Sequence, residues 1–389
     1  MIGKKTVILR APLLTSSGYG THSRQIFRWL KTRSDVEVVT QPVPWGITSW
    51  LINPDDHDGL IGDIMSTTSM NNSGADISIQ LQLPNEWNPH LAKVNIGVSA
   101  FVETDTCNPA WLECCNAMDA IVVPSKHVAK CIINTGGITT PLYVIPESFY
   151  DCIEKSPDPI DLDFSTSFNF LIFGQLTGFN PENDRKNIFY TIKWLCETFK
   201  DDEDVGIVIK TNSGKNTRID RENTAQLLKK LLGEVRLGPL PRVHFLHGTF
   251  SQQEIASIYQ HSKIKALVSL TRGEGFGLPL LEAAASGLPI IATNWSGHKD
   301  FLDHGQFLDV KYQLEEIHES RIDNHIFMKG ARWAQPLEED AKKRFTKFRR
   351  ASSIPTRWAA ELQEQILEKF SQEAIERIYD EKLKEFFDG

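Results

Sequence analysis

Hydrophobic and polar positions divide the chain into short apolar runs separated by longer amphipathic segments. The short runs are rich in β-branched residues, which favours strands, and they lie at residues 6–9, 37–40, 76–81, 95–101, 120–123, 142–145, 169–173, 205–210, 243–246, 266–270 and 289–293. Segments with helical periodicity lie between them, most clearly at 21–31, 186–200 and 276–287. This alternation predicts an α/β protein with mainly parallel, doubly wound sheets.

Breaks in the pattern predict the domain organisation. Residues 153–167 (IEKSPDPIDLDFSTS) combine prolines and acidic residues without an apolar period, which indicates a linker. After Pro355, apolar residues recur every three to five positions, which predicts an amphipathic helix. We therefore expect a first domain over 1–158, a second over 159–354, and a helix over 355–389 that packs back on the first domain. Residues 50–75 show no period and are expected to form a surface loop.

Composition excludes several classes of protein. The 389 residues are 41% hydrophobic and 24% charged, as in a soluble globular chain and unlike a disordered or collagen-like one. The net charge of −8 means that any site for a polyanion must be local. Six cysteines without a CxxC pair predict reduced thiols in a cytoplasmic protein without a zinc site. The N-terminus is interpreted as a first strand rather than a signal peptide, and no apolar run approaches the roughly 20 residues of a membrane span.

One basic run allows two interpretations. Residues 342–350 (KKRFTKFRR) hold six basic residues in nine, with Phe345 and Phe348 between them. On a helix these two rings share one face and would pack inward, which leaves the basic residues in solvent. On a polyanion-binding surface the cations would instead contact phosphates and the rings would stack on bases.

The segment 266–301 carries the strongest chemical signal. A hydrophobic strand leads into TRGEGFG, where three glycines in five positions let the backbone approach a ligand closely. The helix that follows Gly277 would direct free N–H groups and its positive dipole end at an anion such as a phosphate. Glu274 lies before this helix and Glu282 about two turns into it. The simpler alternative is a glycine-rich turn with two solvated glutamates.

This segment resembles the EX7E signature of the retaining GT-B glycosyltransferases of family 4. Glu274 and Glu282 have the required spacing, and GFGLPLLEAAASGLPIIAT follows the surrounding pattern of that family. The resemblance implies two Rossmann-like domains that face each other across a cleft. It also implies transfer of a sugar from a nucleotide-diphosphate sugar to a hydroxyl, with retention of configuration.

The resemblance implies roles for residues on the donor side. Gly18, Tyr19 and Gly20 match the family's glycine-rich loop after the first strand, which faces the donor's diphosphate. Lys186 matches the family's lysine, and Arg185 is expected to supply the second cation because Gln175 stands where the family usually has arginine. Further donor contacts are expected from the turn after the strand VHFL and from the start of the helix after Glu274, at His247, Gly248, Thr249, Gly275, Phe276, Gly277 and Leu278.

The implied reaction needs no cofactor beyond the nucleotide-diphosphate sugar and no divalent metal, because side-chain cations stabilise the leaving diphosphate. Glu274 would hold sugar hydroxyls and Glu282 the ribose diol. Glu103 and Asp105 follow a strand where the family often places an acceptor-side or catalytic polar residue; the alternative is that one of them caps the next helix.

Two other functions stay open at this stage. In one of them, the acceptor is a hydroxylated base in DNA instead of a glycan or a small molecule. In the other, the protein binds sugar nucleotides without transferring the sugar.

Overall fold

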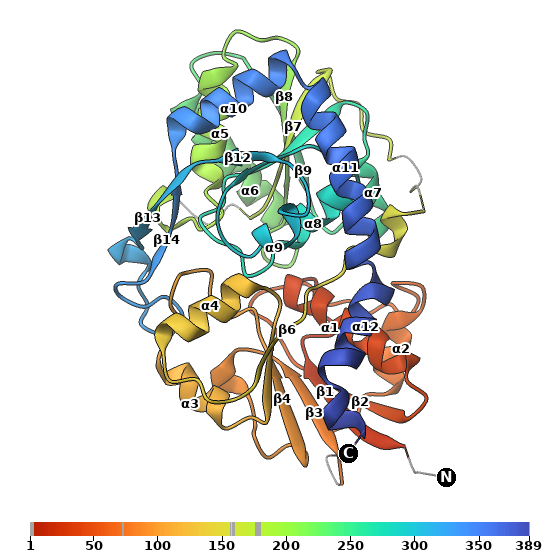
Figure 1. Ribbon diagram of the computed structural model, residues 1–389. Helices are drawn as coiled ribbons and strands as arrows, with labels where there is room; N and C mark the ends of the chain where they lie inside the picture. Colours follow the sequence, from red (N-terminus) through yellow and green to blue (C-terminus); the bar gives the residue numbers. More distant parts are fainter. Residues whose placement is uncertain (1–3, 72–73, 156, 158–159, 176–179, 389) are drawn as a thin grey trace. The chain divides into compact units, whose positions relative to one another are not determined.

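The computed structural model describes residues 4–71, 74–155, 157, 160–175 and 180–388. The chain divides into two compact units (Figure 1). Unit 1 takes the residues up to 148 and again from 372 onward, and unit 2 takes residues 149–371. All six cysteines are described and carry free thiols. Among the residues that the structure describes, no helix is long and apolar enough to cross a membrane.

Unit 1 is built on a six-stranded parallel sheet with the strand order β2-β1-β3-β4-β5-β6. Its strands are β1 (Lys5–Ala11), β2 (Val36–Pro42), β3 (Ile77–Leu81), β4 (Val94–Val98), β5 (Ala120–Val123) and β6 (Leu142–Val144). Its helices are α1 (Gly18–Thr32), α2 (Leu60–Ser66), the short η1 (Pro84–Glu86), α3 (Ala110–Asn116), α4 (Lys126–Thr135), α12 (Gln372–Lys382) and α13 (Lys384–Asp388).

The C-terminal helix α12 completes unit 1 by packing on α1. The ring of Tyr379 stacks on that of Trp29 at a centroid distance of 4.6 Å, and its hydroxyl lies 3.1 Å from Nε2 of His22. Asp380 accepts a hydrogen bond of 2.9 Å from the indole of Trp29. Because Tyr379, Trp29 and His22 are buried, the last residues of the chain supply part of the core of unit 1.

Unit 2 holds a second six-stranded parallel sheet with the order β12-β11-β10-β7-β8-β9. Its strands are β7 (Phe168–Phe173), β8 (Val205–Thr211), β9 (Arg242–His247), β10 (Ile264–Ser269), β11 (Ile290–Thr293) and β12 (Leu308–Val310). A two-stranded antiparallel hairpin, β13 (Tyr312–Glu316) and β14 (Arg332–Pro336), follows β12.

Helices cover both faces of the second sheet, which explains why its strands are continuous apolar runs. Every second residue of β7, such as Phe168 and Phe170, packs into a core shared with α5 (Ile188–Thr198), α6 (Arg218–Val235) and α10 (Glu338–Arg350). The opposite face is covered by α7 (Gln252–Tyr259) and α8 (Leu278–Ala285), and α11 (Ser353–Phe370) packs on α8. The remaining short helices are η2 (Asp151–Ile153), η3 (Pro181–Asn183), α9 (Lys299–Leu302) and η4 (Glu319–Arg321).

The units divide at residues other than those expected from the sequence. The first boundary lies at 148 rather than 158, because the chain that follows already packs on unit 2: η2 contacts α7, and the carbonyl of Ile153 accepts a hydrogen bond of 3.1 Å from the side chain of Gln260. Residues 156, 158 and 159 of the expected linker lie outside the described residues. Near the C-terminus the chain leaves helical geometry at Ser371, so that α11 belongs to unit 2 and α12 and α13 to unit 1.

Two local predictions are corrected or resolved. Residues 60–66 are a helix rather than part of a loop, and burial of Ile61 and Ile64 holds it in place. A helix of seven residues is too short to show a clear apolar period, which is why the pattern missed it. The basic run 342–350 lies in α10 with Phe345 and Phe348 in the core, as its first interpretation expects.

Candidate functional site

The predicted donor residues of unit 2 gather where the order of its strands reverses. The chain forms β7, β8 and β9 toward one side and then returns to place β10 on the other side of β7. Ligands of doubly wound sheets bind beyond the carboxyl ends of the strands at such a point. The loop after β10 carries Glu274, and the turn before α5 carries Arg185 and Lys186.

Glu274 is a buried carboxylate held by two cations. Lys186 Nζ lies 2.7 Å from Oε1 and 2.8 Å from Oε2, and Arg185 Nη1 donates to Oε2 at 3.3 Å. Burial acts to raise the pKa of Glu274, but the charges of Lys186 and Arg185 outweigh it and lower the pKa to about 2. The carboxylate is therefore ionised at neutral pH, and the three side chains together carry a net positive charge.

The turn before α5 fixes both cations. The carboxylate of Asp184 accepts the backbone N–H of Lys186 at 3.0 Å and that of Ile188 at 2.6 Å. Asn187 adopts a left-handed conformation with φ of 56°, which turns the chain into the helix. Cations at a helix N-terminus oppose the helix dipole, so a negative group beside them is needed, and Glu274 is that group.

The backbone of Glu274 is held by Ser296 and Gly297, which follow β11 and were not among the site residues expected from the sequence. Its N–H donates to Ser296 Oγ at 2.9 Å, and its carbonyl accepts the N–H of Gly297 at 2.9 Å. A Cβ on Gly297 would lie 2.2 Å from the carbonyl oxygen of Gly275, so only glycine fits there. A glycine shortly after a predicted strand was the one sequence signal for this contact.

Gly277, whose φ of 108° requires glycine, is the N-cap of α8, and this helix carries Glu282. Contrary to the alternative of a solvated residue, Glu282 is only 3% exposed. Burial raises its pKa to about 8, although the hydroxyl of Tyr259 donates to Oε2 at 3.1 Å. Glu274 and Glu282 therefore differ in protonation at neutral pH.

A small cavity adjoins Glu274. Its wall includes Lys186 and Gly277 and is completed by Phe173, Leu267, Ser269, Pro279 and Leu280, from the ends of β7 and β10 and the first turn of α8. The cavity therefore joins the ammonium of Lys186, the buried carboxylate of Glu274 and the start of α8.

The ends of β8 and β9 bring together the other predicted donor residues. His247 Nε2 lies 3.0 Å from Ser213 Oγ, and Thr249 accepts a hydrogen bond of 2.9 Å from Asn216. The carbonyl of Gly248 accepts a hydrogen bond of 2.9 Å from Lys210 Nζ, a buried ammonium that no sequence pattern pointed to. Burial lowers the pKa of Lys210 to about 8.

In unit 1, the predicted glycine-rich loop is the first turn of α1. Ser17 is the N-cap, and its hydroxyl accepts the N–H of Gly20 at 2.9 Å. Gly20 must be glycine because a Cβ would lie 2.2 Å from the carbonyl oxygen of Thr15. The hydroxyl of Tyr19 bonds to Ser99 and to the N–H of Ala100 at the end of β4. The prediction of a loop at 18–20 was therefore wrong, because the serine before the glycines starts the helix at once.

Glu103 and Asp105 follow β4 in unit 1, as expected, and both are partly exposed. They come after Phe101, whose φ of 52° is unusual for a bulky side chain and turns the chain away from the sheet. Neither caps α3: the side chain of Asn108 accepts the N–H of Ala110 at 3.0 Å. The capping alternative for these two acids is thereby excluded.

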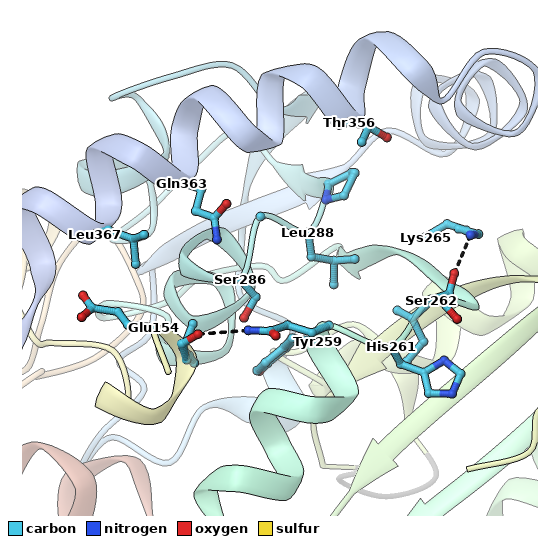
Figure 2. Close-up of a pocket in the computed structure, with 15 residues that line it drawn as sticks. Glu154, Tyr259, His261, Ser262, Lys265, Ser286, Leu288, Thr356, Gln363 and Leu367 are labelled. Carbon is cyan, nitrogen blue, oxygen red and sulfur yellow. Dashed lines mark hydrogen bonds between the residues drawn. The ribbon is translucent and has the colours of Figure 1, made fainter. Parts of the chain in front are cut away.

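A larger cavity of about 680 Å³ lies elsewhere in unit 2, beside α11 (Figure 2). Figure 2 shows Thr356, Gln363 and Leu367 of α11 along it. None of the residues selected from the sequence lines it. Tyr259 lines it too, and the hydroxyl of Tyr259 bonds to Glu282.

Comparison with known proteins identifies the part of the chain that holds this site. Residues 185–323 match the family model described as Glycosyl transferases group 1. The chain contains a glycosyl transferases group 1 domain. A probable sucrose-phosphate synthase of Thermosipho melanesiensis is 30% identical over 140 residues, which are 36% of this chain and 30% of that protein. The match thus spans less than a third of the relative's length.

Solved structures show likeness over nearly the whole chain. Sucrose-phosphate synthase from Thermosynechococcus elongatus has a TM-score of 0.64 at 14% identity, covering 99% of this chain and 100% of that one. HepE of Anabaena, in complex with UDP and glucose, has a TM-score of 0.61 at 11% identity, covering 98% and 100%. The chain has the GT-B fold of two Rossmann-like units that the sequence predicted. The glycosyl transferases group 1 domain contains Arg185, Lys186, Glu274 and Glu282.

Proposed function

We propose that the protein is a retaining glycosyltransferase that uses a nucleotide-diphosphate sugar. The observation that carries this proposal is the arrangement of Lys186 and Arg185 on the buried carboxylate of Glu274. Two cations against one carboxylate leave a positive charge at the carboxyl edge of the sheet, where an anionic ligand is favoured. The glycosyl transferases group 1 domain around these residues supports the same conclusion.

UDP is the nucleotide that we propose for the donor. The HepE structure holds UDP and glucose, and an E. coli structure described as trehalose-6-phosphate is bound with UDP-2-fluoro glucose. The base would lie at the ends of β8 and β9, near His247, Gly248 and Thr249. The ribose diol would bind Glu282, and the sugar hydroxyls would bind Glu274.

The reaction breaks the bond between the anomeric carbon and the phosphate oxygen, and negative charge accumulates on the leaving diphosphate. Lys186 and Arg185 would stabilise that charge together with backbone N–H groups at Gly275 to Leu278. Donors that are already oriented cost no reorganisation at the moment of reaction. The acceptor oxygen forms the new bond on the same face, and its proton passes to the leaving phosphate oxygen. No step requires a divalent metal.

For the acceptor we propose a hydroxyl of a glycan or small molecule, with Glu103 and Asp105 of unit 1 in its binding. The arrangement of α10 gives no support to the alternative of a hydroxylated base in DNA. Phe345 and Phe348 are in the core and cannot stack on bases. Lys342 and Arg349 of the same run already pair with Glu197 and Asp202.

A donor screen tests the proposal. The protein is incubated with UDP-, GDP- and ADP-sugars, and release of the nucleoside diphosphate is followed together with the anomeric configuration of the product by NMR. We expect UDP to be released from a UDP-sugar. We also expect the product to keep the anomeric configuration that the sugar has in the donor. Inversion would contradict the retaining mechanism, and binding of UDP-sugars without any release would support the non-catalytic alternative.

A further inference from the structure

Arg272, two residues before Glu274, is one of the largest fully buried side chains of the protein, at 1% exposure. A buried guanidinium is costly unless its donors are satisfied. The glutamate nearest to it, Glu182, is 3.5 Å away and 43% exposed, so this ion pair alone is a weak compensation. Burial accordingly lowers the pKa of Arg272 from its usual value.

Backbone carbonyls of a distant turn surround one nitrogen of the guanidinium, Nη1. Nη1 donates to the carbonyl oxygens of Pro181, Glu182 and Asp184 at 2.9, 3.0 and 3.2 Å. These carbonyls belong to the turn that leads directly into Arg185 and Lys186. The planar fork of arginine suits such a cluster, and the single ammonium of lysine cannot reproduce it.

The other side of Arg272 is held by the hairpin. Its Nε donates to the side chain of Gln335 at 2.9 Å, and the guanidinium carbon lies 5.3 Å from the ring centre of Trp333. The carbonyl of Arg272 accepts the N–H of Ala334 at 2.9 Å. All three partners come from β14, which lies beyond the residues 185–323 matched by the family model.

The backbone of Arg272 completes the connection to the basic pair. Its N–H donates to the carbonyl oxygen of Arg185 at 2.8 Å, and the neighbouring hydroxyl of Thr271 lies 3.3 Å from the same oxygen. The loop of Glu274 and the turn of Lys186 are therefore joined through one residue, by both its side chain and its main chain.

We propose that Arg272 is a positioning residue that holds the turn 181–186, so that Arg185 and Lys186 meet the donor's diphosphate. The inference rests on the proposed function of the basic pair. Arg272 acts through the two cations and not on the ligand, because its guanidinium is occupied by the carbonyls of the turn, by Gln335 and by Glu182. Hairpin β13–β14 is thereby part of the donor site's support.

The experiment measures affinity for UDP and for uridine by titration calorimetry. We expect Arg272→Met to weaken UDP binding at least tenfold, with less than a threefold change for uridine, and Arg272→Lys to restore only part of the loss. In a background that already carries Arg185→Ala and Lys186→Ala, Arg272→Met should weaken UDP binding less than threefold. Arg349→Met is the matched control, because Arg349 is bonded to Asp202 in the same unit without touching this turn; its UDP affinity should match the parent.

The outcomes separate the inference from the proposed function. A parent that does not bind UDP contradicts both. A parent that binds UDP, together with an Arg272→Met protein of equal affinity, contradicts the inference alone. If Arg272→Met weakens UDP binding by the same factor in the parent and in the protein that lacks both cations, the inference is also overturned. Arg272 would then act by a route other than Arg185 and Lys186. If Arg272→Met does not fold, Arg272→Lys and Gln335→Ala are judged by the same comparisons.

Discussion

The ammonium of Lys186 lies 2.7 and 2.8 Å from the two carboxylate oxygens of Glu274, although 88 residues separate them in the sequence. This contact joins the start of α5 to the loop after β10. In the form described, the carboxylate holds the lysine in place. Binding of a diphosphate would give Lys186 and Arg185 a stronger anionic partner and leave Glu274 available to sugar hydroxyls.

Glu274→Gln should reduce transfer at least a hundredfold and also lower stability at neutral pH. The carboxylate has a pKa of about 2 in the folded protein, below its ordinary value of 4.5. Its contribution, about 1.5–3 kcal/mol for hydrogen bonds to charged groups, is therefore present above pH 4.5 and lost as the pH falls through 2.

Urea unfolding at pH 7 and at pH 3 measures this contribution of Glu274. The difference between the parent and Glu274→Gln should be smaller at pH 3. Glu339→Gln, which changes an exposed carboxylate in the first turn of α10, serves as the control. A difference that does not depend on pH would show that the ion pair does not stabilise the fold.

Glu282 should release a proton when the donor binds. Burial raises its pKa to about 8, so the carboxyl is mostly protonated at pH 7. A ribose diol donates hydrogen bonds and therefore binds best to the ionised carboxylate of Glu282. The affinity for the nucleotide sugar should then increase as the pH rises toward 8 and level off above it. Calorimetry at pH 7 in two buffers of different ionisation enthalpy counts the released protons. Glu282→Gln should release none, and a parent that also releases none would rule out the ribose role.

Chelators should leave turnover unchanged, because Lys186 and Arg185 supply the charge that a divalent ion would otherwise supply. The measurement compares initial rates after dialysis against EDTA with rates after addition of Mg²⁺ or Mn²⁺. The expected rates agree within twofold. A rate that vanishes with EDTA and returns with a metal ion would overturn the proposed charge stabilisation.

Tyr379 should be important for the stability of unit 1. Its buried ring stacks on Trp29 and its hydroxyl meets His22, whose pKa burial lowers to about 3. Tyr379→Ala should cost about 3–5 kcal/mol because it leaves a cavity, whereas Tyr379→Phe should cost about 1 kcal/mol for the lost hydrogen bond. Urea unfolding measures both, with exposed Glu381→Ala as the control. Equal effects of the two changes would contradict the packing of α12 on α1.

Local sequence patterns predicted the central sheets because the strands of parallel sheets are buried on both faces. Every apolar run interpreted as a strand is one, including the β7 and β10 strands that flank the site. The edge strand β12 was missed because it has only three residues, LDV. The hairpin β13–β14 was missed as well, since YQLEE and RWAQP are short and largely polar. The break at Ser371 between α11 and α12 was also missed, because the apolar spacing continues almost unchanged across it.

Within the candidate site, the sequence identified side chains but not their contacts. The spacing of Glu274 and Glu282 pointed to both glutamates, yet their opposite pKa shifts arise from Lys186 and from burial beside Tyr259, which are distant in the sequence. Arg272 is next to the motif, but its partners are backbone carbonyls about 90 residues earlier. Such partners carry no side-chain signature, so only the fold reveals them.

The rate of UDP release from a UDP-sugar by Lys186→Ala tests the central claim most directly. Loss of one oriented donor to the leaving group should lower kcat about 10²–10³-fold. Lys193→Ala, which changes a lysine of α5 that pairs with Glu197, should keep the parental rate. A Lys186→Ala protein that folds and turns over at least half as fast as the parent would contradict the assignment of this cluster to the donor's diphosphate.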